Sequence, residues 1–222
     1  MMSAIQRVIG AASITAVAVM LVSCVASQPA GLSNAPMLPT AAPNALLPVS
    51  AFDRISNRSA RSAALFKEAA KVIQDPRCSN CHPADRTPTQ GDDMHVHSPL
   101  IKADDKGHGP PGLPCNTCHQ AQNTPTHVAP IESIPGHAHW MLAPPSMAWQ
   151  GLTTGEICEQ VKDPARNGGR SLEKIHEHMS TDTLVGWAWN PGAGRRPAAG
   201  TQQQFGELVA AWIETGAQCP TP

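Results

Sequence analysis

Two short stretches, Cys78-Ser79-Asn80-Cys81-His82 and Cys115-Asn116-Thr117-Cys118-His119, share one pattern that decides how the chain folds. In each, two residues separate a pair of cysteines, and a histidine follows at once. This spacing lets both thiols reach the vinyl groups of one porphyrin, while the histidine binds iron from the same side. The stretches therefore predict two covalently bound c-type haems. The thioethers would come from Cys78, Cys81, Cys115 and Cys118, and the first iron ligands would be His82 and His119.

Two other chemistries also use paired cysteines. A four-cysteine zinc site has this spacing but leaves the two adjacent histidines without a role. A thioredoxin-like dithiol needs a strand, a turn and a helix around it, and the flanking sequence has no such pattern. Both are weaker interpretations than haem attachment.

The composition fits a small core that depends on a cofactor. The chain of 222 residues has 22 Pro and 17 Gly, but three Phe and no Tyr. Chains this poor in large apolar residues often need staples, metals or cofactors for stability. The formal net charge is −1 and no basic stripe is present, so nothing indicates a nucleic-acid partner.

The N-terminus has the pattern of a bacterial export signal. An apolar run over residues 8–22 is too short to span a bilayer comfortably. It ends at Leu21-Val22-Ser23-Cys24, which resembles a lipobox. Residues 1–23 are therefore expected to be a lipoprotein-type signal peptide, and Cys24 to carry the lipid. Ordinary cleavage near Ala26 or Ser27, which would leave a soluble protein, is the alternative. The pattern predicts a periplasmic protein, anchored to a bacterial membrane by its lipid.

Two of the seven cysteines are left once haem and lipid attachment are assigned. These are Cys158 and Cys219. An oxidising compartment favours a disulfide between them.

The expected fold is mainly α, with long haem-ordered loops and little or no sheet. Residues 24–50, rich in Pro, Ala, Ser and Asn, are expected to hold the lipid anchor and a flexible tether. Residues 51–222 would form the dihaem cytochrome c domain. Apolar spacing predicts a helix over residues 53–74, which Asp75-Pro76 would stop.

Three later helices are expected from their capping residues. Thr153 and Glu156 form one capping box, and Thr201 and Gln204 form another. Ser171 can cap a shorter helix between them. An apolar stripe follows Thr201, and the last helix is expected to stop at Gly216.

The segment between His82 and Trp149 has no sustained period, yet it contains seven of the ten histidines. Metal coordination could order such a segment. The candidates for the second ligand of each iron are His95, His97, His108, His127, His137, His139, His176, His178, Met94, Met141, Met147 and Met179. We favour His97, where a loop can return over the first haem, and His139, in a rigid loop beside Trp140.

The second ligands decide the chemistry. Histidine on both sides of each iron would suit electron transfer at a lower potential, whereas methionine would raise the potential. A missing ligand would open the iron to a small molecule, as in a dihaem peroxidase or a haem-based sensor. Arg166 and Arg170 are candidate contacts for haem propionates, although a solvated turn is an equal interpretation.

Four stretches together resemble a known family. They are residues 76–119, Met147-Ala-Trp-Gln-Gly151, Lys162-Asp-Pro-Ala-Arg-Asn-Gly-Gly-Arg170 and Leu184-Val-Gly-Trp-Ala-Trp-Asn-Pro191. The family consists of small dihaem cytochromes labelled as isoquinoline 1-oxidoreductase subunits, and the resemblance covers about residues 60–220.

The resemblance implies that this chain accepts electrons from the catalytic subunits of a periplasmic molybdenum hydroxylase. It would pass them to a partner cytochrome or another respiratory component. The chain has no plant-type [2Fe–2S] cysteine spacing and is too short for a molybdopterin domain. The resemblance thus implies an electron-carrying subunit without catalytic residues of its own.

Overall fold

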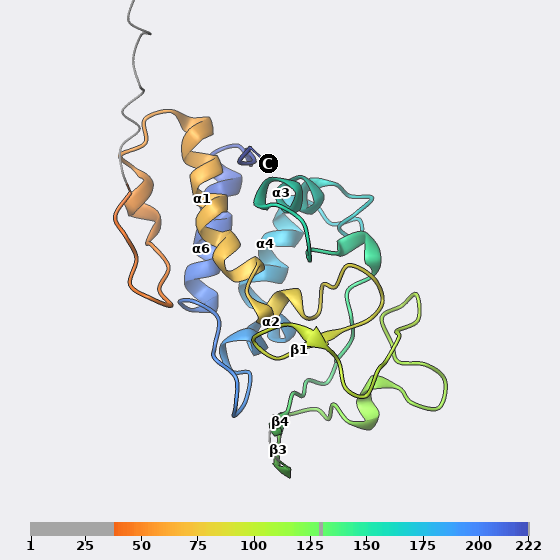
Figure 1. Ribbon diagram of the computed structural model, residues 1–222. Coiled ribbons are helices and arrows are strands. Elements are labelled where there is room, and N and C mark those ends of the chain that lie inside the picture. The colour runs from red at the N-terminus through yellow and green to blue at the C-terminus, as the bar shows by residue number, and fades with distance from the viewer. Residues whose placement is uncertain (1–37, 129–130, 222) are drawn as a thin grey trace, which may run out of the picture. The chain divides into compact units, whose positions relative to one another are not determined.

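The computed structural model describes residues 38–128 and 131–221. In this part of the chain, six α-helices and several 3-10 helices are joined by long loops, with two sheets of two strands each (Figure 1). The prediction of a mainly α fold with little sheet is confirmed. The expected signal peptide and Cys24 lie outside the described residues.

The first long helix starts later than its apolar pattern predicts. Helix α1 spans Arg58–Ile73, because the side chain of Asn57 accepts a hydrogen bond from the backbone N–H of Ala60 and caps it there. The helix ends before Asp75-Pro76, as predicted. The side chain of Asp75 then caps helix α2, Pro76–Ser79, with a proline in its first turn. The first Cys-x-x-Cys-His stretch therefore begins inside a helix.

The capping residues expected for the later helices are confirmed. Both predicted capping boxes are present, and the side chain of Ser171 accepts from the backbone N–H of Lys174. The remaining helices are α3 (Thr154–Lys162), α4 (Leu172–Thr181), α5 (Thr183–Gly186) and α6 (Gln202–Glu214).

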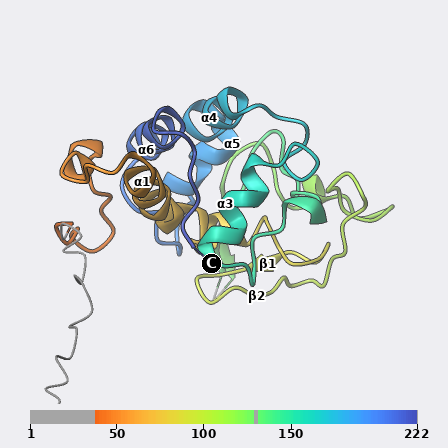
Figure 2. The same cartoon turned by 90° about the horizontal axis from the view of Figure 1, so that it is seen from above.

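The core lies where α6 packs against both α1 and α4 (Figure 2). Phe66 of α1 meets Trp212 of α6 with 4.9 Å between ring centroids. The first residues of this core precede the expected domain boundary at residue 51. Leu46 and Leu47 are buried beside the helices, and the 3-10 helix η1 (Val49–Phe52) buries Phe52. Leu46 and Leu47 therefore belong to this core, although they fall within the range expected for the flexible tether, residues 24–50.

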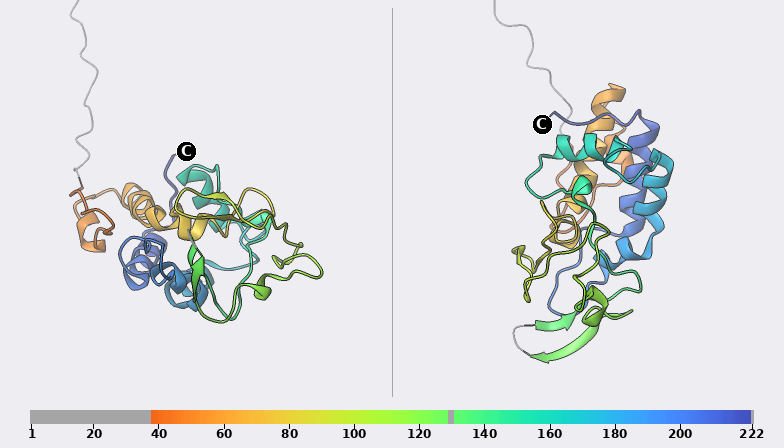
Figure 3. Two further views of the ribbon diagram at one scale, coloured as in Figure 1. Left: turned by 60° about the horizontal axis from the view of Figure 1, so that its bottom comes forward. Right: turned by 90° about the vertical axis from the view of Figure 1, so that its right-hand side faces the viewer.

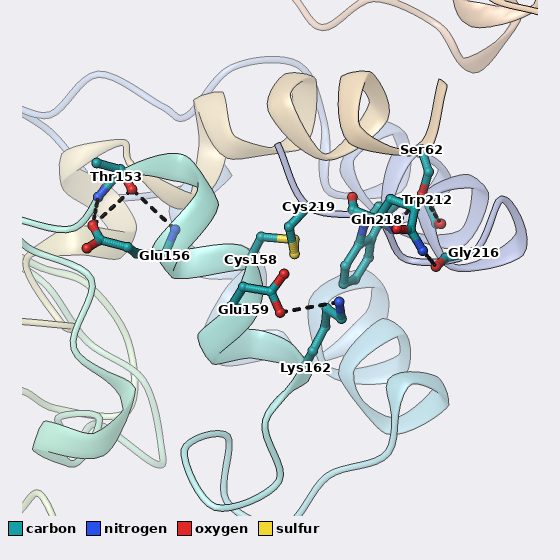
Figure 4. Close-up of a disulfide and its surroundings, with 10 residues drawn as sticks. All are labelled: Ser62, Thr153, Glu156, Cys158, Glu159, Lys162, Trp212, Gly216, Gln218 and Cys219. Carbon is teal, nitrogen blue, oxygen red and sulfur yellow. Dashed lines mark hydrogen bonds and ion pairs between the residues drawn. A yellow bond between two sulfur atoms is a disulfide. The ribbon is translucent and has the colours of Figure 1, made fainter. Parts of the chain in front are cut away.

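The predicted disulfide between Cys158 and Cys219 is present (Figure 4). Cys158 lies fully buried in α3, and Cys219 follows α6 with 5.6 Å between the two Cα atoms. The bridge therefore ties the segment after α6 to α3. Trp212 donates its indole N–H to the Gln218 carbonyl at 3.0 Å, which fixes the same segment.

Long loops hold Cys81 and His82 of the first motif and most of the surroundings of the second. Two short hairpins order them: β1 (Thr89–Gln90) with β2 (His95–Val96), and β3 (Thr124–Val128) with β4 (Ile131–Ile134). The second hairpin projects away from the helices (Figure 3). Among the described helices, none has the length and apolar character needed to cross a membrane.

Candidate cofactor site

The first motif follows directly from α1. Helix α2 contains Cys78, and Cys81 and His82 come just after its end. The Cys78 side chain packs against the hydrophobic core. Cys81 lines a cavity on the other side of the motif. The motif thus joins the helical core to the loops.

The segment around Met147, which forms the 3-10 helix η3 (Pro145–Met147), closes over His82. The Nδ1 atom of His82 lies 2.7 Å from the Met147 carbonyl oxygen. The Trp149 indole stacks on the His82 ring, with 3.6 Å between centroids and 3° between planes. The Trp149 N–H donates to the buried Gln160 of α3 at 2.8 Å. The ring of His82 is therefore held on one face and at one nitrogen.

The second motif has the same arrangement in an unrelated setting. Its cysteines lie in and just after the 3-10 helix η2 (Cys115–Thr117), and His119 comes next. The Nδ1 atom of His119 lies 2.8 Å from the Pro135 carbonyl oxygen. The Trp140 indole stacks on the His119 ring at 4.6 Å and 11°. Trp187 supports Trp140 edge-on at 5.2 Å.

These contacts fix the tautomer of both histidines. A carbonyl oxygen only accepts hydrogen bonds, so Nδ1 carries the proton and Nε2 keeps its lone pair. Burial lowers the pKa of His82 to about 4 and also lowers the pKa of His119, which keeps both rings neutral at pH 7. A neutral imidazole with a hydrogen-bonded Nδ1 is the usual form of a histidine that binds a metal.

The four motif thiols form no disulfide with one another, in contrast to Cys158 and Cys219. Burial raises the pKa of the Cys78 thiol strongly and raises that of Cys81 to about 11. Burial also raises the pKa of Cys115. A redox dithiol needs the opposite, a thiolate stabilised near neutral pH. The dithiol interpretation therefore loses support.

The zinc interpretation needs four cysteines around one ion. In residues 38–128 and 131–221, no group of three or more His, Cys, Asp or Glu side chains is gathered as a metal site. The two motifs instead contribute to a larger shared space. A cavity of about 560 Å³ is lined by Cys81 of the first motif and by Cys115, Cys118 and His119 of the second.

The cavity has a mixed lining that suits a large apolar ligand with polar edges. Trp140 lines it, together with the charged side chains of Arg77, Arg195 and Glu132. The apolar lining includes Ile101, Leu113, Ile134, Met141 and Leu142.

His97, one of the two predicted distal ligands, lines this cavity but lies beside the second motif. Its ring centroid is 5.9 Å from that of His119. Its Nδ1 atom lies 2.8 Å from the Pro99 carbonyl oxygen, so its Nε2 also keeps a lone pair. His97 is therefore brought next to the second motif, whereas its loop was expected to return over the first haem, and its role as a ligand stays a prediction. The chain between the motifs is long enough to cross to the second.

The other predicted distal ligand, His139, is exposed and does not line the cavity. Its ring lies 5.9 Å from that of His137, whose two nitrogens contact Thr183 and the His139 backbone. His178 of α4 lies within electrostatic range of His82, since its charge contributes to lowering the pKa of His82. Its Nδ1 is 2.9 Å from a carboxylate oxygen of Asp182.

Several positioning residues are not evident from the sequence. The carbonyls of Met147 and Pro135 act through the backbone, which side-chain patterns do not reveal. Gln150 donates to the Ser79 carbonyl at 3.0 Å and to Thr89 at 2.7 Å, and so ties the closing segment to the first motif. Trp149, two residues after Met147, is the one sequence feature that could have indicated this contact with His82.

No family model, curated protein or solved structure matches this chain. The site therefore has to be interpreted from its own geometry.

Proposed function

We propose that this chain is an exported dihaem c-type cytochrome that transfers electrons. Cys78 and Cys81 would bind one haem and Cys115 and Cys118 the other, each with its adjacent histidine on iron. The repeated arrangement of the two histidines is the observation that carries this proposal. Two stretches in different surroundings both pair an Nδ1–carbonyl hydrogen bond with a stacked indole. The same pair of contacts at both motif histidines is not expected from unrelated packing.

The second site fits the group by a simple distance test. With metal–nitrogen bonds of roughly 2 Å, two imidazoles on opposite sides of one metal have centroids about 6 Å apart. The rings of His97 and His119 are 5.9 Å apart, and both present Nε2. We therefore propose His97 as the second ligand of the haem at Cys115 and Cys118.

The second ligand of the first iron stays a prediction. His139 lies on the surface beside His137. His178 is half-buried in α4, with its Nδ1 held by Asp182, and its charge contributes to lowering the pKa of His82. A carboxylate bonded to Nδ1 orients a histidine and makes Nε2 more basic, so His178 is the stronger candidate of the two.

The placement of the motifs favours electron transfer between them. Cys81 of the first motif and Cys115 of the second line one cavity. Bound haem would supply a one-electron redox couple at each motif. The chain's own task is to hold the two groups close, keep their histidines in the binding tautomer and exclude water with Trp140 and Trp149.

The resemblance in sequence supports a more specific proposal. The chain would accept electrons from a molybdenum hydroxylase of the isoquinoline 1-oxidoreductase type and pass them toward the respiratory chain. A lipid on Cys24 would anchor it to a membrane on the periplasmic side. These points rest on the resemblance and on the lipobox-like stretch alone.

The test uses the full chain made in a bacterium competent in c-type cytochrome maturation. Reduced protein should show sharp low-spin absorption bands that do not shift under carbon monoxide. The double variant Cys115→Ala/Cys118→Ala should keep half the haem absorbance, as should Cys78→Ala/Cys81→Ala. The matched control Cys158→Ala/Cys219→Ala should keep all of it.

Three outcomes would overturn the proposal. Full absorbance in both motif variants would show that haem is held elsewhere. A high-spin ferric signal with rapid peroxide turnover would favour a dihaem peroxidase-like enzyme, and reversible gas binding without turnover would favour a sensor.

A further inference from the structure

The cavity lined by both motifs has two arginines in its wall. One of them forms ion pairs with carboxylates, and the other does not. Arg77 and Arg195 both line it, and the charge of Arg77 contributes to lowering the pKa of Arg195. Arg77 precedes the first motif, whereas Arg195 lies in the loop after Trp187–Trp189 (η4). Two like charges at one cavity are costly unless an anion lies between or beside them.

Arg77 is already compensated by carboxylates. Its side chain is 1% exposed, and it forms ion pairs with Asp92 and with Asp75, the latter at 3.9 Å. The Nη atoms also donate to the Gly91 and Arg196 carbonyls at 3.3 Å. One polar atom, Nε, is buried without a hydrogen-bond partner.

Arg195 is half-buried but bonds only to neutral oxygens. Its Nη atoms donate to the hydroxyl and carbonyl of Ser133 at 2.8 and 2.6 Å, and to the Pro191 and Ala193 carbonyls at 3.3 and 3.4 Å. No carboxylate of the described residues forms an ion pair with it, although Glu132 lines the same cavity. Burial, followed by the charge of Arg77, lowers the pKa of Arg195, and the charge of Asp92, which is itself ion-paired with Arg77, only partly offsets this.

An unpaired guanidinium in a partly buried wall calls for an anion. Taking a charge out of water is expensive unless it is paired and hydrogen-bonded. Arginine presents a planar fork that matches carboxylates. Arg195 lines the same cavity as Cys115, Cys118 and His119 of the second motif.

We propose that Arg195, with Arg77 behind it, binds a propionate carboxylate of the haem carried at Cys115 and Cys118. This inference rests on the proposed function, and it adds an anion site that the motifs do not predict. The Ser133 contacts position the guanidinium before the carboxylate arrives. The negative charge of the bound propionate then neutralises the positive charge of Arg195.

The arginines expected from the sequence to serve this role lie elsewhere. Neither Arg166 nor Arg170 lines the cavity. Arg170 donates to the Asn167 carbonyl of its own loop at 2.9 Å. It is therefore a matched control, since it is also half-buried and loses the same charge when changed to glutamine.

The experiment compares wild type, Arg195→Gln, Arg195→Lys and Arg170→Gln as full, haem-loaded chains. Each is titrated potentiometrically at several pH values, and resonance Raman spectra record the propionate bending bands. In Arg195→Gln the potential of one haem should fall, because a nearby positive charge disfavours the oxidised form. That potential should also become more dependent on pH near neutrality, because the propionate is more easily protonated. One propionate band should shift.

Arg195→Lys should keep most of the potential but still shift the Raman band, since it retains the charge and loses the fork. It also serves if Arg195→Gln does not accumulate. The inference is overturned if two haems are present and both Arg195 variants match wild type and Arg170→Gln in potential and bands. If wild type carries no haem, the proposed function itself is wrong. That result is distinguishable from a failure of the Arg195 proposal, which requires two haems to be present.

Discussion

At the residue scale, the histidines of the two motifs are predictable and their partners are not. His82 and His119 follow their cysteines in the chain, so spacing alone identifies them. His97 reaches His119 through a loop whose path depends on the β1–β2 hairpin and on cavity packing. The other eight histidines are all candidates for the two proposed distal positions, and no local pattern in the sequence separates them.

The choice of distal ligand can be tested by paired substitutions. We expect His97→Ala to convert one haem from low to high spin and to let it bind carbon monoxide, because His97 faces His119 at 5.9 Å. His139→Ala, on the exposed neighbour of His137, should leave that haem low spin. Electron paramagnetic resonance of the ferric protein measures both. Two low-spin signals in His97→Ala would contradict the assignment.

A pH dependence is expected from the capping box of α3. The backbone N–H of Thr153 donates to the Glu156 carboxylate at 2.8 Å, and this bond lowers the pKa of Glu156. Such a carboxylate stabilises the fold above its unfolded pKa of about 4.3 and loses that effect as pH falls through the lower folded value.

We therefore expect Glu156→Ala to be less stable than wild type at pH 7, with the difference shrinking as the pH falls below about 4. Urea unfolding at pH 7 and at pH 3 measures the difference. Glu159→Ala, which removes only a surface ion pair of 3.3 Å with Lys162, is the control. A loss in Glu156→Ala that stays constant with pH would contradict the capping role.

At the element scale, helices with caps were predictable, whereas the backbone between them was not. The boxes at Thr153 and Thr201 set the starts of α3 and α6, because the cap bonds are local. The start of α1 was missed because Ile55 continues the apolar pattern beyond the Asn57 cap. The loops owe their order to carbonyl and indole contacts across the chain, which periodicity cannot report.

The turn after β4 is expected to tolerate no side chain at Gly136. A Cβ there would lie 2.0 Å from the Gln122 carbonyl oxygen. Gly136→Ala should displace the neighbouring Pro135 carbonyl from His119 and cost about 1–3 kcal/mol in unfolding free energy. Urea unfolding and the low-spin signal of the second haem report the two effects. Normal stability together with an unchanged signal would contradict the close approach.

The link between α3 and the chain end should matter more than any single cap. The disulfide closes a loop with a sequence separation of 61 residues. Cys158→Ala/Cys219→Ala should lower the free energy of unfolding by about 4 kcal/mol, mainly through the entropy of the unfolded chain. Thermal unfolding of the double variant measures this loss. A melting temperature unchanged from wild type would contradict it.

At the scale of the whole molecule, residues of both Cys-x-x-Cys-His motifs line one cavity. The sequence predicted both motifs, the mainly α fold and the disulfide, since each depends on spacing or on counting cysteines. It could not predict that Cys81 and Cys115 line a common space, or that Arg195 lies in its wall. Those relations arise only when α2, the η2 turn and the loop after η4 are brought together.

The most direct test is the mass of the intact mature protein, made with the c-type maturation machinery and measured under denaturing conditions. We predict a mass that exceeds the polypeptide by two haems, because thioether bonds survive unfolding. A denatured chain that weighs no more than its amino acids, whether colourless or shedding its colour on unfolding, would contradict covalent attachment at the two motifs.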